Sequence, residues 1–192
     1  IARQQQMIST LNNINNNSMT QTTLLFDLET TGLLRRGSQL HCIVARDMAD
    51  SGDALVWDSP RGNLTEGVEQ LRRADVLVGH NVLGFDIPMI QELYDFDFQG
   101  QVIDTLVLSR LFYPHIADRD FERRPLGMPQ KLYGRHSLEA WGYRLKCFKG
   151  DFGKHEAAWD VYTPEMLDYC IQDTEVTVKL YELMLRRIND YA

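Results

Sequence analysis

The segment Asp75–Gly79, with the sequence Asp-Val-Leu-Val-Gly, constrains the fold more than any other part of the chain. It is short and nearly all apolar, which is typical of a strand that is buried on both faces of a sheet. A strand of this kind needs further layers of structure on both sides. The segment therefore predicts a sheet that is covered by helices.

The pattern around this strand has short apolar runs first and an alternation of strands and helices afterwards. Further strands are predicted at Thr23–Leu28, Leu40–Ala45, Ala54–Trp57 and Val102–Ile103. Helices are predicted at Leu64–Ala74, at Phe85–Tyr94, from 104 to Leu111, at Leu138–Leu145 after an N-cap at Ser137, and from Pro164 to about Ile188 after an N-cap at Thr163. The stretch Phe112–Arg135 contains three prolines and is predicted to be a long irregular loop. The order favours an α/β sandwich around a mixed sheet.

The 192 residues fit one domain, which we place at 22–192. Residues 1–21 are rich in Asn and Gln, and we interpret them as a leader or extension, with Met19 as a plausible native start. Three widely separated cysteines, Cys42, Cys147 and Cys170, indicate a reducing compartment, and we expect them to be buried apolar residues. No apolar run approaches the roughly 20 residues that span a bilayer, so no membrane partner is expected.

The charge of the chain is unevenly distributed. The net charge is −7, but the segment 110–154 carries ten Lys or Arg against five Asp or Glu. One part of the molecule can therefore attract phosphate while the rest repels it, although a solvated basic loop would give the same count. The candidate phosphate contacts in this segment are Arg119, Arg123, Arg124, Lys131 and Arg135.

Two acids, Asp27 and Glu29, lie two residues apart at the end of the first predicted strand. Side chains at this spacing point to the same face. Two carboxylates on a buried face repel each other and lose hydration, and a divalent cation would offset both costs. The alternative is that both side chains lie beyond the strand end in solvent.

Two further acids carry weaker signals. Asp86 follows a buried strand and stands near the start of a predicted helix, where an acid also interacts favourably with the helix dipole. Tyr169 and Asp173 are four residues apart on the last predicted helix and so share one face. Each feature alone has a structural explanation, namely a charged helix start or a half-buried Tyr beside a solvated Asp.

Taken in order, Asp-x-Glu, then Asn-x-x-x-Phe-Asp, then Tyr-x-x-x-Asp resemble the three motifs of the DEDD exonuclease superfamily, in the subclass with Tyr in the third motif. The segments Ile103–Arg110 and His136–Leu145 are similar to the exonuclease domain of pol I-like (family A) DNA polymerases of short-tailed bacteriophages. The resemblance covers roughly 23–185 and implies a ribonuclease H-like mixed central sheet flanked by helices. It also implies a polymerase module as a partner and the cytoplasm of a bacterial host as the location.

The resemblance further implies hydrolysis of phosphodiester bonds at DNA 3′ ends with two divalent cations, Mg²⁺ or Mn²⁺, and release of nucleoside 5′-monophosphates. Asp27 would bridge both cations, Glu29 and Asp173 would hold the cation that activates water, and Asp86 would hold the second through water. Tyr169 would orient the attacking water. Carboxylate oxygens are the ligands that such hard cations prefer.

Substrate contacts follow from the resemblance with alternatives attached. Leu33 matches a wedge that packs on the terminal base of a single-stranded 3′ end, or it covers the core from a turn. Asn81 holds the terminal nucleotide or caps a turn. His136 and His80 make structural hydrogen bonds, although His136 also has a possible substrate role, and Asp104 caps a helix. Two alternative functions remain, a free-standing exonuclease on RNA or small oligonucleotides and a non-catalytic nucleic-acid-binding module of the same fold.

Overall fold

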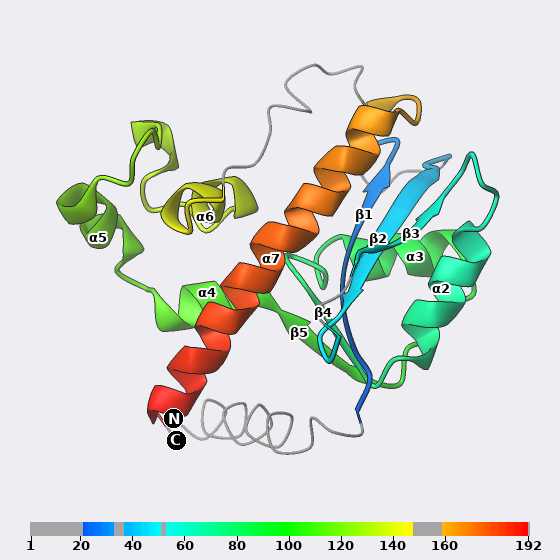
Figure 1. The fold of residues 1–192 in the computed structure, drawn as a ribbon, viewed down its shortest axis with the longest axis horizontal. Helices are drawn as coiled ribbons and strands as arrows, with labels where there is room; N and C mark the ends of the chain where they lie inside the picture. Colours follow the sequence, from blue (N-terminus) through cyan, green and yellow to red (C-terminus); the bar gives the residue numbers. More distant parts are fainter. Residues whose placement is uncertain (1–20, 33–36, 51–52, 148–158, 192) are drawn as a thin grey trace.

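The computed structural model describes residues 21–32, 37–50, 53–147 and 159–191. Its centre is one five-stranded sheet with the order β3-β2-β1-β4-β5 (Figure 1). The strands are β1 (Thr23–Thr30), β2 (Leu40–Asp47), β3 (Leu55–Asp58), β4 (Val76–Gly79) and β5 (Gln101–Asp104). The β1–β2 and β2–β3 pairs are antiparallel, and the β1–β4 and β4–β5 pairs are parallel. The mixed sheet expected from the sequence is therefore confirmed.

The two faces of the sheet bury alternate residues of each strand, as the strand period requires. Leu25 of β1, together with Val76 and Val78 of β4, packs into one hydrophobic core. Phe26 of β1 and Leu77 of β4 pack into the core on the other face. All four residues of β4 are buried, so the strand that suggested a covered sheet lies between two helical layers.

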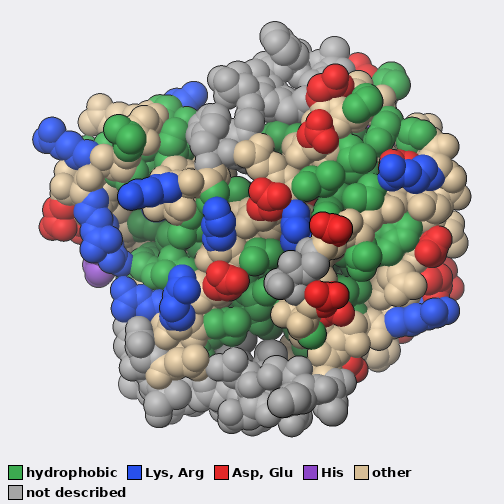
Figure 2. Space-filling model, in the orientation of Figure 1, with side chains coloured by type: hydrophobic (Ala, Val, Ile, Leu, Met, Phe, Trp, Pro, Cys, Tyr) green, Lys and Arg blue, Asp and Glu red, His purple; other side chains and the backbone are tan. Residues whose placement is uncertain are grey.

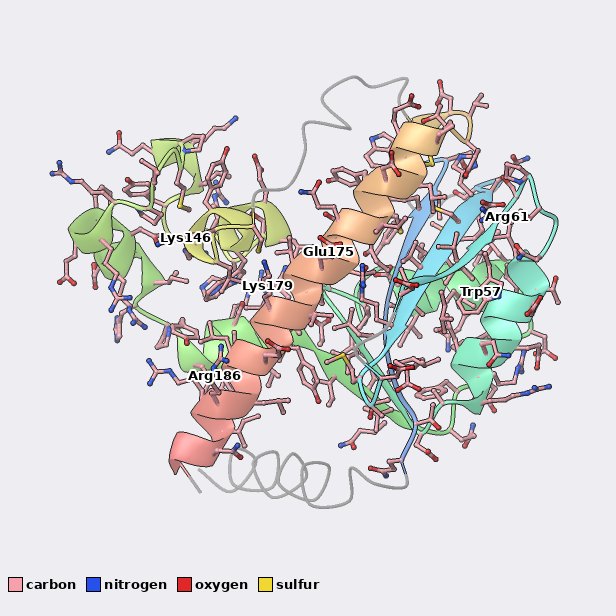
Figure 3. The ribbon with its side chains drawn as sticks, in the orientation of Figure 1. Trp57, Arg61, Lys146, Glu175, Lys179 and Arg186 are labelled. Atoms are coloured by element: carbon pink, nitrogen blue, oxygen red, sulfur yellow. The ribbon has the colours of Figure 1, made fainter. Side chains whose placement is uncertain are left out.

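Helices α2 (Leu64–Arg73) and α3 (Asp86–Leu93) cover the face that contains Phe26. The long helix α7 (Pro164–Tyr191), with α4 (Thr105–Phe112), covers the opposite face and crosses it diagonally (Figure 1). Trp57 is buried between the sheet and α2 (Figure 3). Within the described residues, no helix is long and apolar enough to cross a membrane.

The interval 112–135 is more regular than the sequence predicts. It contains α5 (Ile116–Arg123) and a 3-10 turn, η1 (Gln130–Leu132), which form a lobe with α6 (Leu138–Arg144) beside α7 (Figure 1). The expected irregular loop is therefore wrong over 116–123. Asp120 of α5 accepts hydrogen bonds from Arg144 of α6, at 2.9 Å from Nε and 2.7 Å from Nη2. This tertiary pairing stabilises a helix that local sequence does not indicate.

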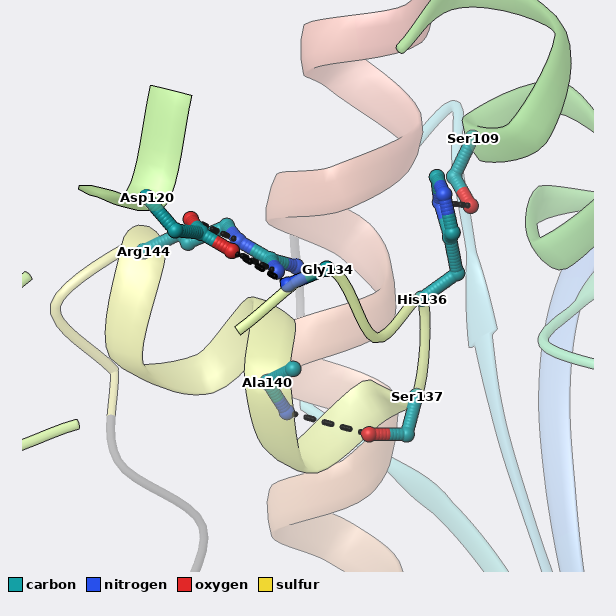
Figure 4. A network of polar contacts seen from close by, with 7 residues as sticks. All are labelled: Ser109, Asp120, Gly134, His136, Ser137, Ala140 and Arg144. Carbon is teal, nitrogen blue, oxygen red and sulfur yellow. Dashed lines mark hydrogen bonds and ion pairs between the residues drawn. The ribbon is translucent and has the colours of Figure 1, made fainter. Parts of the chain in front are cut away.

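The predicted helix caps are confirmed. The Ser137 hydroxyl accepts from the Ala140 N–H at the start of α6, at 3.3 Å (Figure 4). The Thr163 hydroxyl accepts from the Met166 N–H at the start of α7, at 3.1 Å. These bonds fix the residues at which the two helices begin. The start of α7 in turn sets the position of the third acidic motif over the sheet.

Candidate active site

The first pair of acids lies inside β1, not beyond its end. Asp27 pairs with Val44 and Glu29 with Cys42 across the antiparallel β1–β2 ladder. Both share the strand face of Leu25, which packs against α7. The Glu29 side chain is 8% exposed, so the alternative of two solvated acids is wrong. A pair of carboxylates on one strand face, with Glu29 buried and Asp27 partly buried, is an arrangement that a bound cation would stabilise.

Helix α7 brings the third motif to this face. Asp173 is 4% exposed and lines a cavity that Asp27 also lines. Tyr169, one turn earlier, is half-buried, and its ring meets the Trp159 ring edge-to-face at 5.8 Å. The Trp159 carbonyl in turn lies 3.0 Å from His41 Nε2 of β2. Trp159 is therefore a packing residue that limits the orientations open to the tyrosine.

Asp86 opens α3 and is 3% exposed. Burial, followed by the nearby charges of Asp27 and Asp104, raises the pKa of Asp86 well above its ordinary value. The backbone N–H groups of Asp86 and Leu28 oppose this shift only in part. A cation bound beside Asp86 would oppose this shift, because a nearby positive charge favours the ionised carboxylate.

The turn before α3 is shaped by a glycine and by Asp104. A Cβ at Gly79 would lie 2.9 Å from the Phe26 carbonyl oxygen and would clash with Val82, so β4 must end in glycine. Asp104 caps α4 through the Leu106 N–H and also accepts from the Asn81 N–H, both at 2.9 Å. The expected capping role of Asp104 is confirmed, and it extends across strands to hold the turn.

Asn81 adopts φ 65°, a left-handed conformation that asparagine tolerates better than most residues. Its side chain is exposed, and the residue lines the cavity. Asn81 therefore has a turn conformation, in which its carbonyl accepts from the Gly84 and Phe85 N–H groups, and its exposure leaves it accessible from the cavity.

The cavity itself has a volume of about 550 Å³ and opens between β1, the 80–81 turn, α4, the start of α6 and α7. Acids of β1 and α7 line it together with two arginines, Arg110 of α4 and Arg135 before α6. The described lining residues are Asp27, His80, Asn81, Leu106, Arg110, Gly134, Arg135, His136, Ser137, Leu138 and Asp173. Arg110 was not singled out from the sequence, although it ends one of the phage-polymerase-like segments. An arginine is suited to bind phosphate beside such acids.

Two histidines on the cavity wall make structural hydrogen bonds. His136 Nδ1 lies 2.9 Å from Ser109 Oγ (Figure 4), and His80 Nδ1 lies 2.9 Å from Thr105 Oγ1. Burial, followed by the charges of Arg144 and Arg110, lowers the pKa of His136. His136 also lines the cavity, so its hydrogen bond to Ser109 is compatible with a contact to a substrate.

Cys170 is a residue whose place was missed from the sequence. It is fully buried, as expected, but its thiol lies 3.5 Å from Asp27 Oδ2. One donor atom each from Asp27, Glu29 and Cys170 lie within 4.8 Å of one another. Burial, then the neighbouring Cys42 thiol and Asp27, raise the pKa of Cys170. Position 170 lies between the motif residues 169 and 173. That its side chain faces the acids of β1 becomes clear only from the orientation of α7 in the structure.

The predicted basic contacts separate into different places. Arg135 lines the cavity with the acids, whereas Arg119, Arg123 and Arg124 line another cleft. Lys131 is exposed on η1 and is not among the described lining residues of either. The expected wedge, Leu33, lies outside the described residues.

Comparison with known proteins agrees with this geometry. The mixed sheet with its flanking helices is the ribonuclease H-like fold of exonucleases: the NrnC protein of Brucella melitensis superposes with a TM-score of 0.63 at 17% identity, covering 91% of this chain and 77% of that one. A second structure of that protein, bound to pGG, gives a TM-score of 0.60 over the same share of this chain.

In sequence, the chain is 31% identical over 185 residues to the DNA-directed DNA polymerases of Enterobacteria phage T3 and Escherichia phage T7. Each match covers 84% of this chain and 26% of the polymerase, so the chain spans about a quarter of the relatives' length. No protein-family model matches. The chain is thus related to these phage polymerases and has the fold of DEDD-type exonucleases, which confirms the resemblance drawn from its motifs.

Proposed function

We propose that this chain is a metal-dependent 3′→5′ exonuclease acting on single-stranded DNA ends, and that it serves as the proofreading domain of a phage-type DNA polymerase. The observation that carries the proposal is the convergence of three motifs. Asp27 and Glu29 share the β1 face covered by α7, Asp173 of α7 lines the same cavity, and Asp86 is buried beside Asp27. The relationship to the phage polymerases supports the same function.

The acids fit a pair of hard divalent cations. Three of the four carboxylates are less than a tenth exposed, and burial, followed by the charge of Asp27, raises the pKa of Asp86. We assign Asp27, Glu29, Asp86 and Asp173 as ligands of Mg²⁺ or Mn²⁺. When bound, such cations stabilise charge on the attacking and leaving oxygens of a phosphoryl transfer.

The remaining residues position substrate and water. Arg110 and Arg135, which line the same cavity as Asp27 and Asp173, bind the phosphates of the 3′-terminal nucleotides. Asn81 contacts the terminal nucleotide, and Tyr169 donates a hydrogen bond that orients the attacking water, assisted by Glu29. A frayed strand fits a cavity of this size better than a duplex, so selectivity for mismatched ends needs no readout of the wrong base.

The test is the length of product from 5′-labelled DNA with Mg²⁺ or Mn²⁺, with and without a chelator. Single strands should shorten one nucleotide at a time from the 3′ end, and a mismatched primer should shorten faster than a matched one. Opening a matched end costs about 1.4 kcal/mol per base-pair step in stacking. The Asp27→Ala, Glu29→Ala double variant should fold and show no cleavage. Activity in excess chelator, internal cuts or trimming from the 5′ end would refute the assignment.

A second candidate is a free-standing exonuclease acting on RNA or small oligonucleotides. The observation that favours it is the likeness to a structure of NrnC bound to pGG. Matched DNA and RNA strands and dinucleotides, compared by kcat/KM on the same preparation, distinguish the two. Preference for RNA or dinucleotides would replace the proofreading proposal and keep the chemistry.

A further inference from the structure

A cleft of about 1330 Å³, larger than the active-site cavity, lies between α5, α6 and the C-terminal half of α7. Its walls are largely apolar but carry seven basic side chains: α5 and its end contribute Arg119, Arg123 and Arg124, α6 and its end contribute Arg144 and Lys146, and α7 contributes Arg186 with Arg187. Asp120 is the one acid among the described lining residues, and Arg144 pairs with it at 2.7 Å. The cleft therefore keeps a large excess of positive charge.

Several of these arginines are held in place by aromatic rings. The Arg119 and Arg187 guanidinium groups lie 5.2 and 5.4 Å from the centre of the Tyr113 ring. Arg144 lies 5.0 Å from the centre of the Trp141 ring. Stacked guanidinium groups keep their N–H edges available and lose less conformational freedom when they bind an anion.

The outer cations of the cleft lack acidic neighbours. Arg123, Arg124, Lys146 and Arg186 are exposed, and within the described part of the chain no carboxylate lies within 4.0 Å of their charged atoms. Basic side chains gather over this side of the molecule, while acids dominate the opposite side (Figure 2). Figure 3 places Lys146 in the lobe and Arg186 near the end of α7. A concave surface of one sign concentrates the field and attracts a polyanion.

The cleft adjoins the active site through α6. Residues Gly134–Leu138, at and before the start of this helix, line the active-site cavity, and Trp141–Lys146, toward its end, line the cleft. Asp120 links the two, since it binds Arg144 in the cleft and accepts the Gly134 N–H at 2.9 Å (Figure 4). A nucleic-acid strand that has its 3′ end beside Asp27 can thus continue along α6 onto a second basic surface.

We propose that this cleft binds the phosphate backbone of the DNA strand upstream of the 3′ end, which rests on the proposed exonuclease function. Evenly spaced phosphates match a basic wall that continues from Arg110 and Arg135 in the active-site cavity. An acidic protein segment has the same charge, but nothing in its chemistry would require this continuity. The cleft gives the enzyme grip on long strands without any contact to base edges.

The experiment uses the Asp27→Ala, Glu29→Ala chain, so that bound DNA stays intact. Affinity for 5′-fluorescent single strands is measured by anisotropy at several salt concentrations, with and without the additional changes Arg123→Gln and Arg186→Gln. The double cleft variant should bind long strands more weakly, and the slope of log affinity against log salt should fall by about 0.7 per lost phosphate contact. Binding of a trinucleotide should weaken less than binding of a long strand.

The control is Arg73→Gln, an exposed arginine at the end of α2 that, like the outer cleft cations, has no carboxylate within 4.0 Å of its charged atoms among the described residues. If the cleft variant keeps the affinity and salt slope of this control, the proposal is overturned. It is also overturned if the cleft variant loses polyglutamate binding but retains DNA binding, because the occupant is then an acidic protein segment. If the chain with Asp27 and Glu29 intact hydrolyses no DNA, the exonuclease proposal is rejected. If the cleft substitutions still weaken binding of long strands, the cleft site is supported nevertheless. The two failures therefore remain distinguishable.

Discussion

The pair Asp120–Arg144 gives the sharpest stability prediction. Both side chains are nearly buried, at 3% and 9% exposure, and three N–H groups donate to the carboxylate, two from Arg144 and one from Gly134. Arg144→Met would leave the buried Asp120 charge with the Gly134 N–H alone. Removing one partner of a buried pair costs about 3–5 kcal/mol. For a chain of this size, that predicts a fall in Tm of about 6–20 °C.

Calorimetry or circular dichroism melts measure this fall, with Glu175→Gln as the control. Glu175 forms a 3.3 Å pair with Arg46 but is 57% exposed, so its loss should cost about 0–1 kcal/mol. Replacing both buried partners, Asp120→Leu with Arg144→Met, should recover most of the loss. Hydrogen exchange over α5 should rise in the single variant. If Arg144→Met melts within the range of the Glu175→Gln control, the pair does not hold α5 and the reasoning is wrong.

The same pair predicts a pH effect. Burial acts to raise the pKa of Asp120, but the hydrogen bonds from Arg144 and Gly134 outweigh it and lower the pKa below the ordinary 3.8. Because the folded pKa is depressed, the stabilisation is present above the ordinary pKa and is lost as the pH falls through the folded value. Wild-type protein should lose more stability in this acid range than Asp120→Asn. Parallel acid unfolding curves would contradict the assignment.

Three further predictions concern the active site. Tyr169→Phe should slow the single-turnover rate by roughly 10²–10⁴-fold while Mn²⁺ binding, followed by calorimetry, stays the same; an unchanged rate would make Tyr169 a packing residue. Asp86 has a raised pKa in the folded protein, so in the presence of a chelator the Tm should fall as the pH rises from the ordinary 3.8 through the folded pKa. The Asp86→Asn variant should lack this dependence of Tm on pH, and a dependence that persists in the variant would contradict the prediction. Gly79→Ala should cost about 1–3 kcal/mol in urea melts because its Cβ meets Val82, with partial recovery when Val82→Ala is added; full stability of the single variant would show that the turn adapts.

Local patterns predicted most of the sheet and its helices because their signals are local. The apolar run of β4 and the Thr163–Pro164 start of α7 need no distant partner to be recognised. Helix α5 was missed because its sequence, Ile-Ala-Asp-Arg-Asp-Phe-Glu-Arg, is mostly charged and lies between prolines, while its stabilising contact is with Arg144 on another helix. Propensity alone cannot report such a pair.

In the active site, too, local patterns could be predicted from the sequence, whereas contacts between distant elements could not. Motif order predicted the acids and Tyr169 as site residues, whereas the place of Cys170 beside Asp27 depends on the rotation of α7 against β1. The basic residues were predicted as one group, but folding divides four of them between two concave surfaces and leaves Lys131 outside the described lining of both. Charged residues can be counted along a sequence, but the surface that each of them faces is set only when the helices pack.

The placement of the acids on β1 and α7 has a consequence for synthesis of the protein on the ribosome. The β1–β2–β3 part is antiparallel and sequential, so it can pair as soon as those residues emerge. Asp173 is translated after almost all of the described chain, and translation proceeds at about 5–20 residues per second. Until it arrives, Asp27 and Glu29 face no α7. Until α7 has been synthesised and has packed on β1, the nascent chain lacks the full set of acids that the proposed exonuclease needs, so the proposed activity can begin only after the last motif has been translated.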